Sequence, residues 1–175
     1  EDAEQRMLDL LKKKVSIDEK GTGTHIQVSR ILEVAGLGQY LDNLLTISAK
    51  QAIEALQKKQ IDGLYLVDGY QAKNTQALFS DPTLHLSAPW RAEAYAKALP
   101  YLHILNVPMG SFNLAKNLPD RNIQLISTTT NLLVKEDMHP AIQFLFLEAA
   151  REINGRASFF AKEGEFPSFN TYGVS

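Results

Sequence analysis

The chain has no cysteine, little imbalance of charge and no long apolar run, and each of these absences removes a class of function. Without cysteine there is no thiol catalysis, no disulfide and no Cys-based zinc site. The formal net charge of -2 and the pI of about 6.1 point to neither a nucleic acid nor an anionic membrane as partner. No apolar stretch approaches the ~18 residues of a membrane span.

The composition that remains is that of an ordinary globular domain. The chain has 175 residues, of which 45% are hydrophobic and 22% charged, enough for one domain or one domain with an appended piece. Its start, Glu1–Glu4, is acidic and does not resemble a signal peptide. A helical pattern begins almost at once at Met7. We therefore expect this sequence to be a piece of a longer protein.

Short strands and helices alternate along the first half of the chain. Residues 15–17 predict a strand, and a helix follows with Val28, Ile31, Leu32 and Ala35 on one face. For its start we expect a capping box of Thr24 and Gln27, and for its end Gly36. The same order is then repeated, with a strand at 44–47, a capping box of Ser48 and Gln51, a helix, and an apolar strand at 61–67 of the kind buried on both faces.

The second half continues with further elements. We expect helices at 70–79 and 91–98, and strands at 83–87, 102–107, 123–128 and 132–134. A final helix opens at His139-Pro140, with Asp137 as its cap. Successive strand-helix units indicate an α/β fold with a largely parallel sheet.

The final helix carries more apolar surface than one face can use. Ile142, Phe146 and Ile153 share a face, but Phe144 and Leu145 lie elsewhere on the circumference. A helix that is apolar nearly all round needs cover on more than one side. Either it is central in this fold, or it packs on something outside this chain.

The strongest candidate site is the loop that joins the first strand to its helix, Lys20-Gly21-Thr22-Gly23-Thr24-His25. Free backbone N–H groups and the helix dipole converge at such a position, which suits a carboxylate or a similar anion. The spacing matches neither a P-loop nor G-x-G-x-x-G, so nucleotide binding is disfavoured. The alternative is a plain strand-to-helix turn with a good cap.

Two further polar stretches are candidates for the same site. Asp68 could meet an amine and Tyr70 could stack on a ligand; alternatively Asp68 caps the next helix and Tyr70 packs on the surface. Thr129 and Asn131, within Thr128–Asn131, could form a hinge or the polar wall of a cleft, or else an exposed bend in a strand.

The chemistry-bearing residues give no support for an enzyme. None of the four histidines has another ligand at i,i+4, and neither H-E-x-x-H nor G-x-S-x-G occurs. We therefore expect no metal, no cofactor and no catalytic residue. An α/β enzyme stays the weakest of the alternatives.

Several separated motifs, in order, resemble one family. They are Leu10–Ile17 with Gly21–Thr24 and Ile31–Leu37, then Ala52–Leu56 with Ile61–Gly63, then Leu125–Val134 with His139–Ala141, and finally Gly164–Ser168. Together they resemble the TAXI-type solute receptors of TRAP transporters. Two departures are Lys13, where the family commonly has Gly, and Thr22, which replaces Ser but keeps a hydroxyl.

The resemblance implies a type II periplasmic-binding-protein fold in which two α/β lobes close on a small solute. It implies that residues 1–135 form one lobe, and that residues 136–175 would pack on a first lobe missing here. It further implies an extracytoplasmic location, a carboxylate-bearing ligand such as an amino or organic acid, and transporter subunits as partners. A membrane anchor in the full-length protein is left open. Self-association through the last helix is a further option. A regulatory sensing domain with the same fold is the alternative to transport, and the termini of the full-length gene would discriminate the two.

Overall fold

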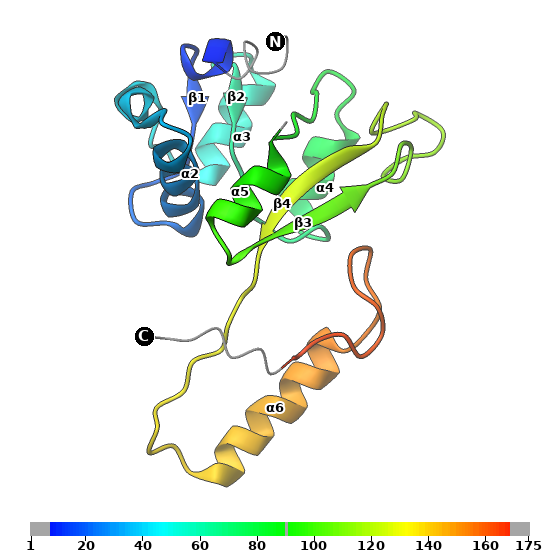
Figure 1. Cartoon of the computed structure of the whole chain (residues 1–175). Coiled ribbons are helices and arrows are strands. Elements are labelled where there is room, and N and C mark those ends of the chain that lie inside the picture. The colour runs from blue at the N-terminus through cyan, green and yellow to red at the C-terminus, as the bar shows by residue number, and fades with distance from the viewer. Residues whose placement is uncertain (1–7, 90, 169–175) are drawn as a thin grey trace. The chain divides into compact units, whose positions relative to one another are not determined.

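A computed structural model describes residues 8–89 and 91–168 of the chain (Figure 1). The expected helical start at Met7 and the residue Trp90 lie outside these ranges. The chain divides into two units, Glu1–Ser127 and Thr128–Ser175. Each is described by itself.

The first unit is built on a short parallel sheet. Strand β1 (Val15–Ser16) pairs in parallel with β2 (Gly63–Leu64). On the other side of β1, Leu45 forms a parallel bridge with Ser16, with N–H···O distances of 2.8 Å from Leu45 to Val15 and 2.9 Å from Ile17 to Leu45. The expected parallel pairing of these segments is confirmed, and with it the α/β class.

The paired part of β2 is shorter than the sequence predicts. Residues 61–67 were expected to be one buried strand, but only Gly63 and Leu64 pair, and the side chains from 63 to 66 are half-buried. Side-chain hydrogen bonds replace strand pairing at both ends of this segment. The Asp62 carboxylate accepts the Lys14 N–H at 3.0 Å, and the Val67 N–H donates to the Thr24 hydroxyl at 3.2 Å.

Two helices connect these strands. Helix α2 (Gly23–Val34) covers β1 through Val28 and Leu32, in a core with Leu11, Val15, Ile17 and Leu44. A 3₁₀ segment, η1 (Gly38–Asn43), follows it. Helix α3 (Ala49–Gln57) begins with the expected capping box of Ser48 and Gln51 and buries Ala52 and Ile53.

Between β2 and residue 89, the chain forms one helix and no strand. Helix α4 spans Lys73–Ser80, so it begins three residues later than predicted from Tyr70. The strand expected at 83–87 is wrong. The Asp81 carboxylate instead accepts bonds from the Thr83 N–H at 2.9 Å and hydroxyl at 2.7 Å. These bonds lower the pKa of Asp81 and hold the chain in a turn.

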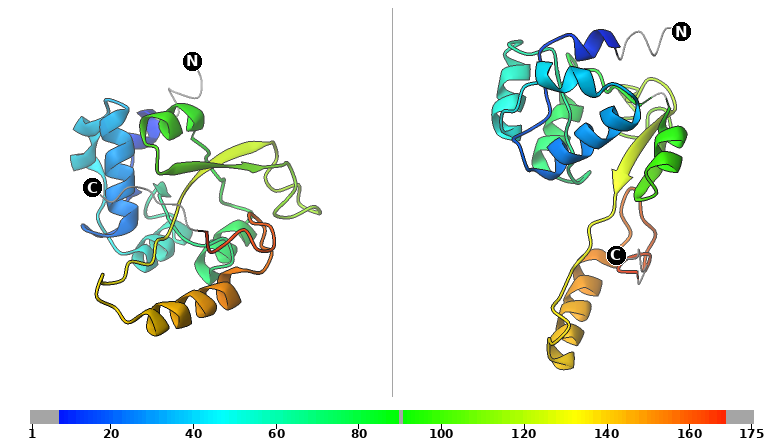
Figure 2. Two further views of the ribbon diagram at one scale, coloured as in Figure 1. Left: turned by 60° about the horizontal axis from the view of Figure 1, so that its bottom comes forward. Right: turned by 60° about the vertical axis from the view of Figure 1, so that its left-hand side comes forward.

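Helix α5 (Ala92–Ala98) lies along β3 (Leu102–Val107), which pairs with β4 (Ile123–Thr128) (Figure 2). These three elements occur where the sequence predicts them. The Ser127 hydroxyl contacts the His103 carbonyl, and the Gln124 amide contacts Asn106. The later residue of β3 thus faces the earlier residue of β4. The two strands therefore form an antiparallel ribbon beside the parallel sheet.

The second unit contains α6 (Pro140–Asn154). Its N-cap is His139, whose Nδ1 accepts the Ala141 N–H at 3.2 Å, so the expected cap at Asp137 is wrong. Pro140 occupies the first turn as predicted. Residues 132–134 form no strand, and their apolar side chains are exposed.

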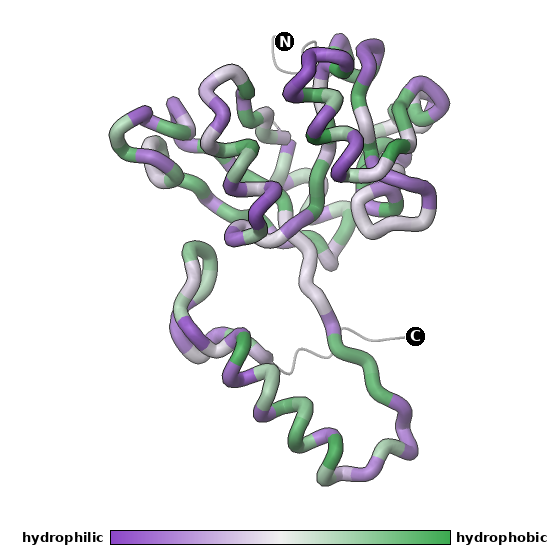
Figure 3. Tube along the Cα trace, turned by 180° about the vertical axis from the view of Figure 1, so that it is seen from behind, coloured by the Kyte–Doolittle hydropathy of each residue, from purple (hydrophilic) through white to green (hydrophobic). Residues whose placement is uncertain are grey.

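Hydrophobic residues recur along α6 (Figure 3), yet none of its residues is buried. Phe144 is 58% exposed, Leu145 66% and Ile153 76%. The residues of its own unit therefore leave the apolar side chains of α6 uncovered.

Candidate functional site

The predicted site loop lies where β1 ends and α2 begins. Thr22 is the N-cap of α2: its hydroxyl oxygen accepts the His25 N–H at 3.3 Å, and the hydroxyl donates to the Glu19 carbonyl at 2.9 Å. The expected capping box of Thr24 and Gln27 is therefore wrong. The chain is extended at Thr22 (φ -74°, ψ 159°) and helical from Gly23, so Thr24 already lies inside the first turn.

Thr24 links the loop to the neighbouring strand. Its side chain is only 4% exposed, and its hydroxyl oxygen accepts the Val67 N–H at 3.2 Å. Val67 follows β2 in the chain. Thr24 thus holds the carboxyl ends of two parallel strands in a fixed relation, and its hydroxyl serves this purpose rather than projecting into solvent.

The first turn of α2 presents unused hydrogen-bond donors. Within the described chain, the N–H groups of Gly23 and Thr24 have no partner. A Cβ at Gly21 or Gly23 would meet no atom within 4 Å, and Gly21 has a φ of +91° that favours glycine. An anion can therefore approach two aligned donors at the positive end of the helix dipole.

Asp18 is a residue that supports the loop and that the sequence did not reveal. It has a φ of +69°, and its carboxylate accepts the Glu19 N–H at 2.9 Å and the Ala49 N–H at 3.0 Å. Ala49 is the first residue of α3. The N-terminus of α3 is thus occupied by an anion of the protein itself, whereas the N-terminus of α2 has none. Because 31 positions separate the two residues, no local pattern could have indicated this bond.

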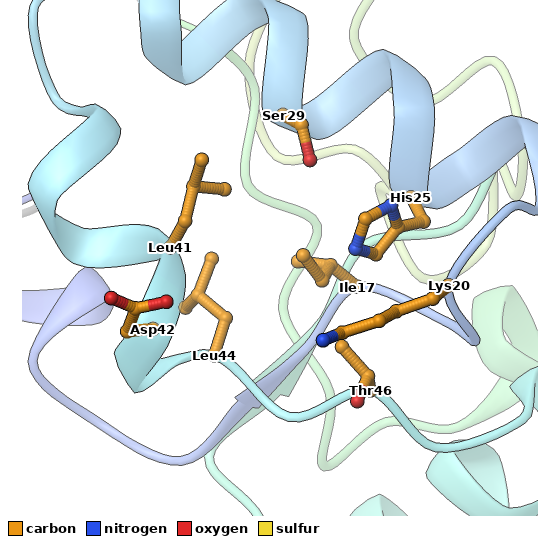
Figure 4. Close-up of a pocket in the computed structure, with 8 residues that line it drawn as sticks. All are labelled: Ile17, Lys20, His25, Ser29, Leu41, Asp42, Leu44 and Thr46. Atoms are coloured by element: carbon orange, nitrogen blue, oxygen red, sulfur yellow. The ribbon is translucent and has the colours of Figure 1, made fainter.

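Beside the loop is a cavity of about 340 Å³ (Figure 4). Lys20 and His25 bring the predicted loop into its wall. Sequence reasoning missed the other residues of the lining, which come from the end of β1, from α2, from η1 and from the segment that bridges to β1. They are Ile17, Ser29, Leu41, Asp42, Leu44 and Thr46.

The other predicted residues of the first unit lie outside this cavity lining. The Asp68 carboxylate accepts the N–H of the adjacent Gly69 at 2.7 Å. The Tyr70 ring centroid lies 5.4 Å from that of Phe112 and 6.2 Å from that of Phe79. Tyr70 thus belongs to an aromatic cluster, and a role in ligand stacking stays a prediction.

Thr129 and Asn131 belong to the second unit. Both side chains are exposed and follow Thr128, the last residue of β4. Their expected role as a polar wall also stays a prediction.

Two features are absent from the described residues. Within residues 8–89 and 91–168, no group of three or more His, Asp or Glu side chains is placed to hold a metal ion. Across those same ranges, every helix falls short of the length and hydrophobicity needed to cross a membrane.

Most of the chain is similar to a known protein family. The family described as the NMT1-like family matches residues 3–147, which is most of the chain. No curated protein matches.

Proposed function

This chain belongs to the NMT1-like family, whose domains are periplasmic-binding-protein-like, and from that premise we propose that it captures a small carboxylate-bearing solute for a TRAP-type membrane transporter. Membership itself supports the coarser statement of a solute-binding domain of a kind that is typically extracytoplasmic and not enzymatic. The transporter class rests on the ordered motifs that resemble the TAXI receptors. An amino or organic acid is the solute class that this resemblance favours.

The observation that carries the proposal is the pair of unpartnered N–H groups at Gly23 and Thr24. They lie at the carboxyl end of β1, where open α/β sheets bind their ligands. In this proposal the solute carboxylate accepts bonds from both, and Gly21 leaves room for its approach. The side chains of Lys20 and His25 stand beside the same loop in the cavity wall.

The remaining predicted residues have supporting roles in this proposal. Thr22 and Thr24 shape the loop through their hydroxyl bonds rather than by direct contact. Tyr70, Thr129 and Asn131 border the solute, and Asp68 meets an α-amine where the solute carries one.

We also propose that residues 136–175 pack on a second α/β lobe, while residues 1–135 form the lobe with the loop. The support is the apolar surface of α6, where Phe144, Leu145 and Ile153 are all more than half exposed. Such side chains are ordinarily covered in a folded protein.

One substitution tests the backbone contact directly. Gly23→Pro deletes a single N–H at the first position of α2, where proline is tolerated. The preceding residue, Thr22, already has the extended backbone that proline requires. Loss of a hydrogen bond to a charged group should weaken solute binding by about 1.5–3 kcal/mol.

The matched control is Gly23→Ala, which keeps the N–H and whose Cβ meets no atom within 4 Å. Calorimetry should use the solute that native mass spectrometry identifies on the purified full-length protein. Equal affinity of the Pro and Ala variants would remove the loop from the binding site. A co-purifying solute without an acidic group would contradict the proposed solute class.

A further inference from the structure

The cavity beside the loop is lined by polar side chains that the protein itself leaves unused. Lys20, His25, Ser29, Asp42 and Thr46 all contribute to the wall. In the described chain, none of these five side chains takes part in a hydrogen bond or an ion pair. Lys20, Asp42 and Thr46 are exposed, and His25 and Ser29 are half-buried, so solvent reaches this wall. Here they are available to a ligand.

The two signs of charge stand at opposite ends of this cavity. Figure 4 shows Lys20 and His25 at one end and Asp42 at the other, with Leu41, Leu44 and Ile17 between them. Ile17 and Leu44 are buried, at 1% and 6% exposure. The floor is therefore apolar and the ends are polar, an arrangement that orients an elongated molecule.

The size of the cavity suits a short molecule. Its volume of about 340 Å³ lies near the lower end of small-molecule pockets, which span roughly 300–1,000 Å³. The acidic end of the solute belongs beside Lys20, because Lys20 shares the loop with the free donors of Gly23 and Thr24. The other end then reaches toward Asp42.

We propose, building on the function above, that this cavity selects short monocarboxylates whose far end carries an amine or a hydroxyl, and that Asp42 is the specificity-determining residue. An ionised carboxylate accepts hydrogen bonds but donates none. Asp42 can therefore accept a bond from a donor group but not from a second carboxylate. A dicarboxylate would bring two like charges together at this end. An α-amino acid would leave Asp42 unmatched, because its amine and carboxylate are attached to the same carbon.

Three probes of equal chain length separate these requirements. They are pentanoate, 5-aminopentanoate and glutarate, which differ only in the group at the far end. Their affinities are measured by NMR titration of the full-length protein, with the amides of Gly21 and Gly23 and the imidazole of His25 as reporters. We expect 5-aminopentanoate to bind about two- to fivefold more tightly than pentanoate, which is the scale of one exposed ion pair, and glutarate to bind most weakly.

Asp42→Asn is the decisive variant, because it keeps the shape of the side chain and removes its charge. It should abolish the preference for 5-aminopentanoate and improve the binding of glutarate. Asp120→Asn is the matched control, since Asp120 is also exposed but lies outside the cavity lining. This control should keep the order of the three probes.

The outcomes distinguish carboxylate capture at the loop from selectivity through Asp42. Equal binding of all three probes, or an unchanged order in Asp42→Asn, overturns the role of Asp42 while leaving carboxylate capture intact. Tightest binding of glutarate likewise overturns it. If none of the probes shifts the reporters, carboxylate capture at this loop fails, and the selectivity built on it fails with it.

Discussion

Asp18 connects two segments that carry the proposed site. Its carboxylate accepts one bond from within the loop and one from the first residue of α3. Its own N–H lies 3.4 Å from the Ser16 hydroxyl, which in turn donates to the Ile47 carbonyl at 3.3 Å. The loop is therefore anchored to the sheet and to α3 at its start, while its glycines remain open.

We expect Asp18→Ala to lower the free energy of unfolding by about 1–3 kcal/mol, because the variant loses a charged hydrogen bond at a helix N-terminus. Asp18→Asn should lose less, since its amide oxygen still accepts and asparagine tolerates the positive φ of 69°. Urea denaturation followed by circular dichroism measures both. Wild-type stability in the Ala variant would show that the bond to Ala49 contributes nothing.

The titration of Tyr65 provides a test in alkaline solution. Burial, with a smaller effect of Tyr95, raises the pKa of the Tyr65 phenol above its usual value of 10.0. The folded state therefore holds the proton longer than the unfolded chain. The associated stability is fully present below pH 10.0 and is lost as the pH rises through the folded pKa.

Tyr65→Phe removes this ionisable group, so its free energy of unfolding should fall less steeply above pH 10 than that of the wild type. Denaturant midpoints measured at closely spaced alkaline pH values give the comparison. Tyr101→Phe is the control, because Tyr101 is 41% exposed. Parallel curves for wild type and Tyr65→Phe would contradict the assignment.

At this scale, the sequence predicted local features and missed distant ones. The position of the glycine-rich loop followed from a strand ending at Ile17 and a helix beginning after it. The bonds from Asp18 to Ala49 and from Thr24 to Val67 join residues 31 and 43 positions apart, so only the folded chain reveals them. The same is true of Asp42, which comes from a 3₁₀ segment that no periodic pattern marked.

At the scale of elements, the end of α2 is the feature that the sequence predicted best. Gly36 has a φ of +72°, and two backbone bonds close the helix, from Gly36 to Glu33 at 3.0 Å and from Leu37 to Leu32 at 2.8 Å. This is a Schellman motif, in which a residue with a Cβ is strained. The following segment, η1, supplies two residues of the cavity wall.

Gly36→Ala should therefore lower the free energy of unfolding by about 1 kcal/mol, the cost of a left-handed conformation for a residue with a Cβ. The control is Gly38→Ala, two residues on, where φ is not in the left-handed region and the nearest atom to a new Cβ is 3.9 Å away. Thermal denaturation of both variants measures the difference. A Gly38→Ala variant as unstable as Gly36→Ala would mean that the strain at Gly36 is not the cause.

Elements with strong periodic patterns or clear caps were predicted, and those whose fate depends on a distant partner were not. β3, β4, α3 and α5 occur at or near the expected bounds. The strand expected at 83–87 failed because a turn at Asp81 competes with it. The strand expected at 132–134 has apolar residues of the right type, but it has no strand to pair with.

At the scale of the whole molecule, all burial is concentrated in one unit. The buried hydrophobic residues run from Leu11 to Ile123, and no residue between 128 and 168 is buried. An isolated helix the length of α6 is marginal in water. The second unit therefore depends on contacts that its own residues do not supply.

Deleting residues 128–175 should leave the unfolding transition of the remainder nearly unchanged, within about 0.5 kcal/mol, because the buried hydrophobic residues, Leu11 to Ile123, all lie in the part that is kept. Guanidinium denaturation of residues 1–127 and of the whole chain provides the comparison. Loss of cooperative unfolding in the shorter chain would show that the first unit needs the second.

A residue of the cavity wall also provides a position for a probe of solute binding. Ser29 is a half-buried residue of α2 that faces this cavity, and the chain contains no cysteine. Ser29→Cys would therefore introduce the only thiol of this chain, so that an environment-sensitive fluorophore could be attached at a single position. Arrival of a solute between Lys20 and Asp42 would then be reported as a change in emission, turning the molecule into an optical sensor.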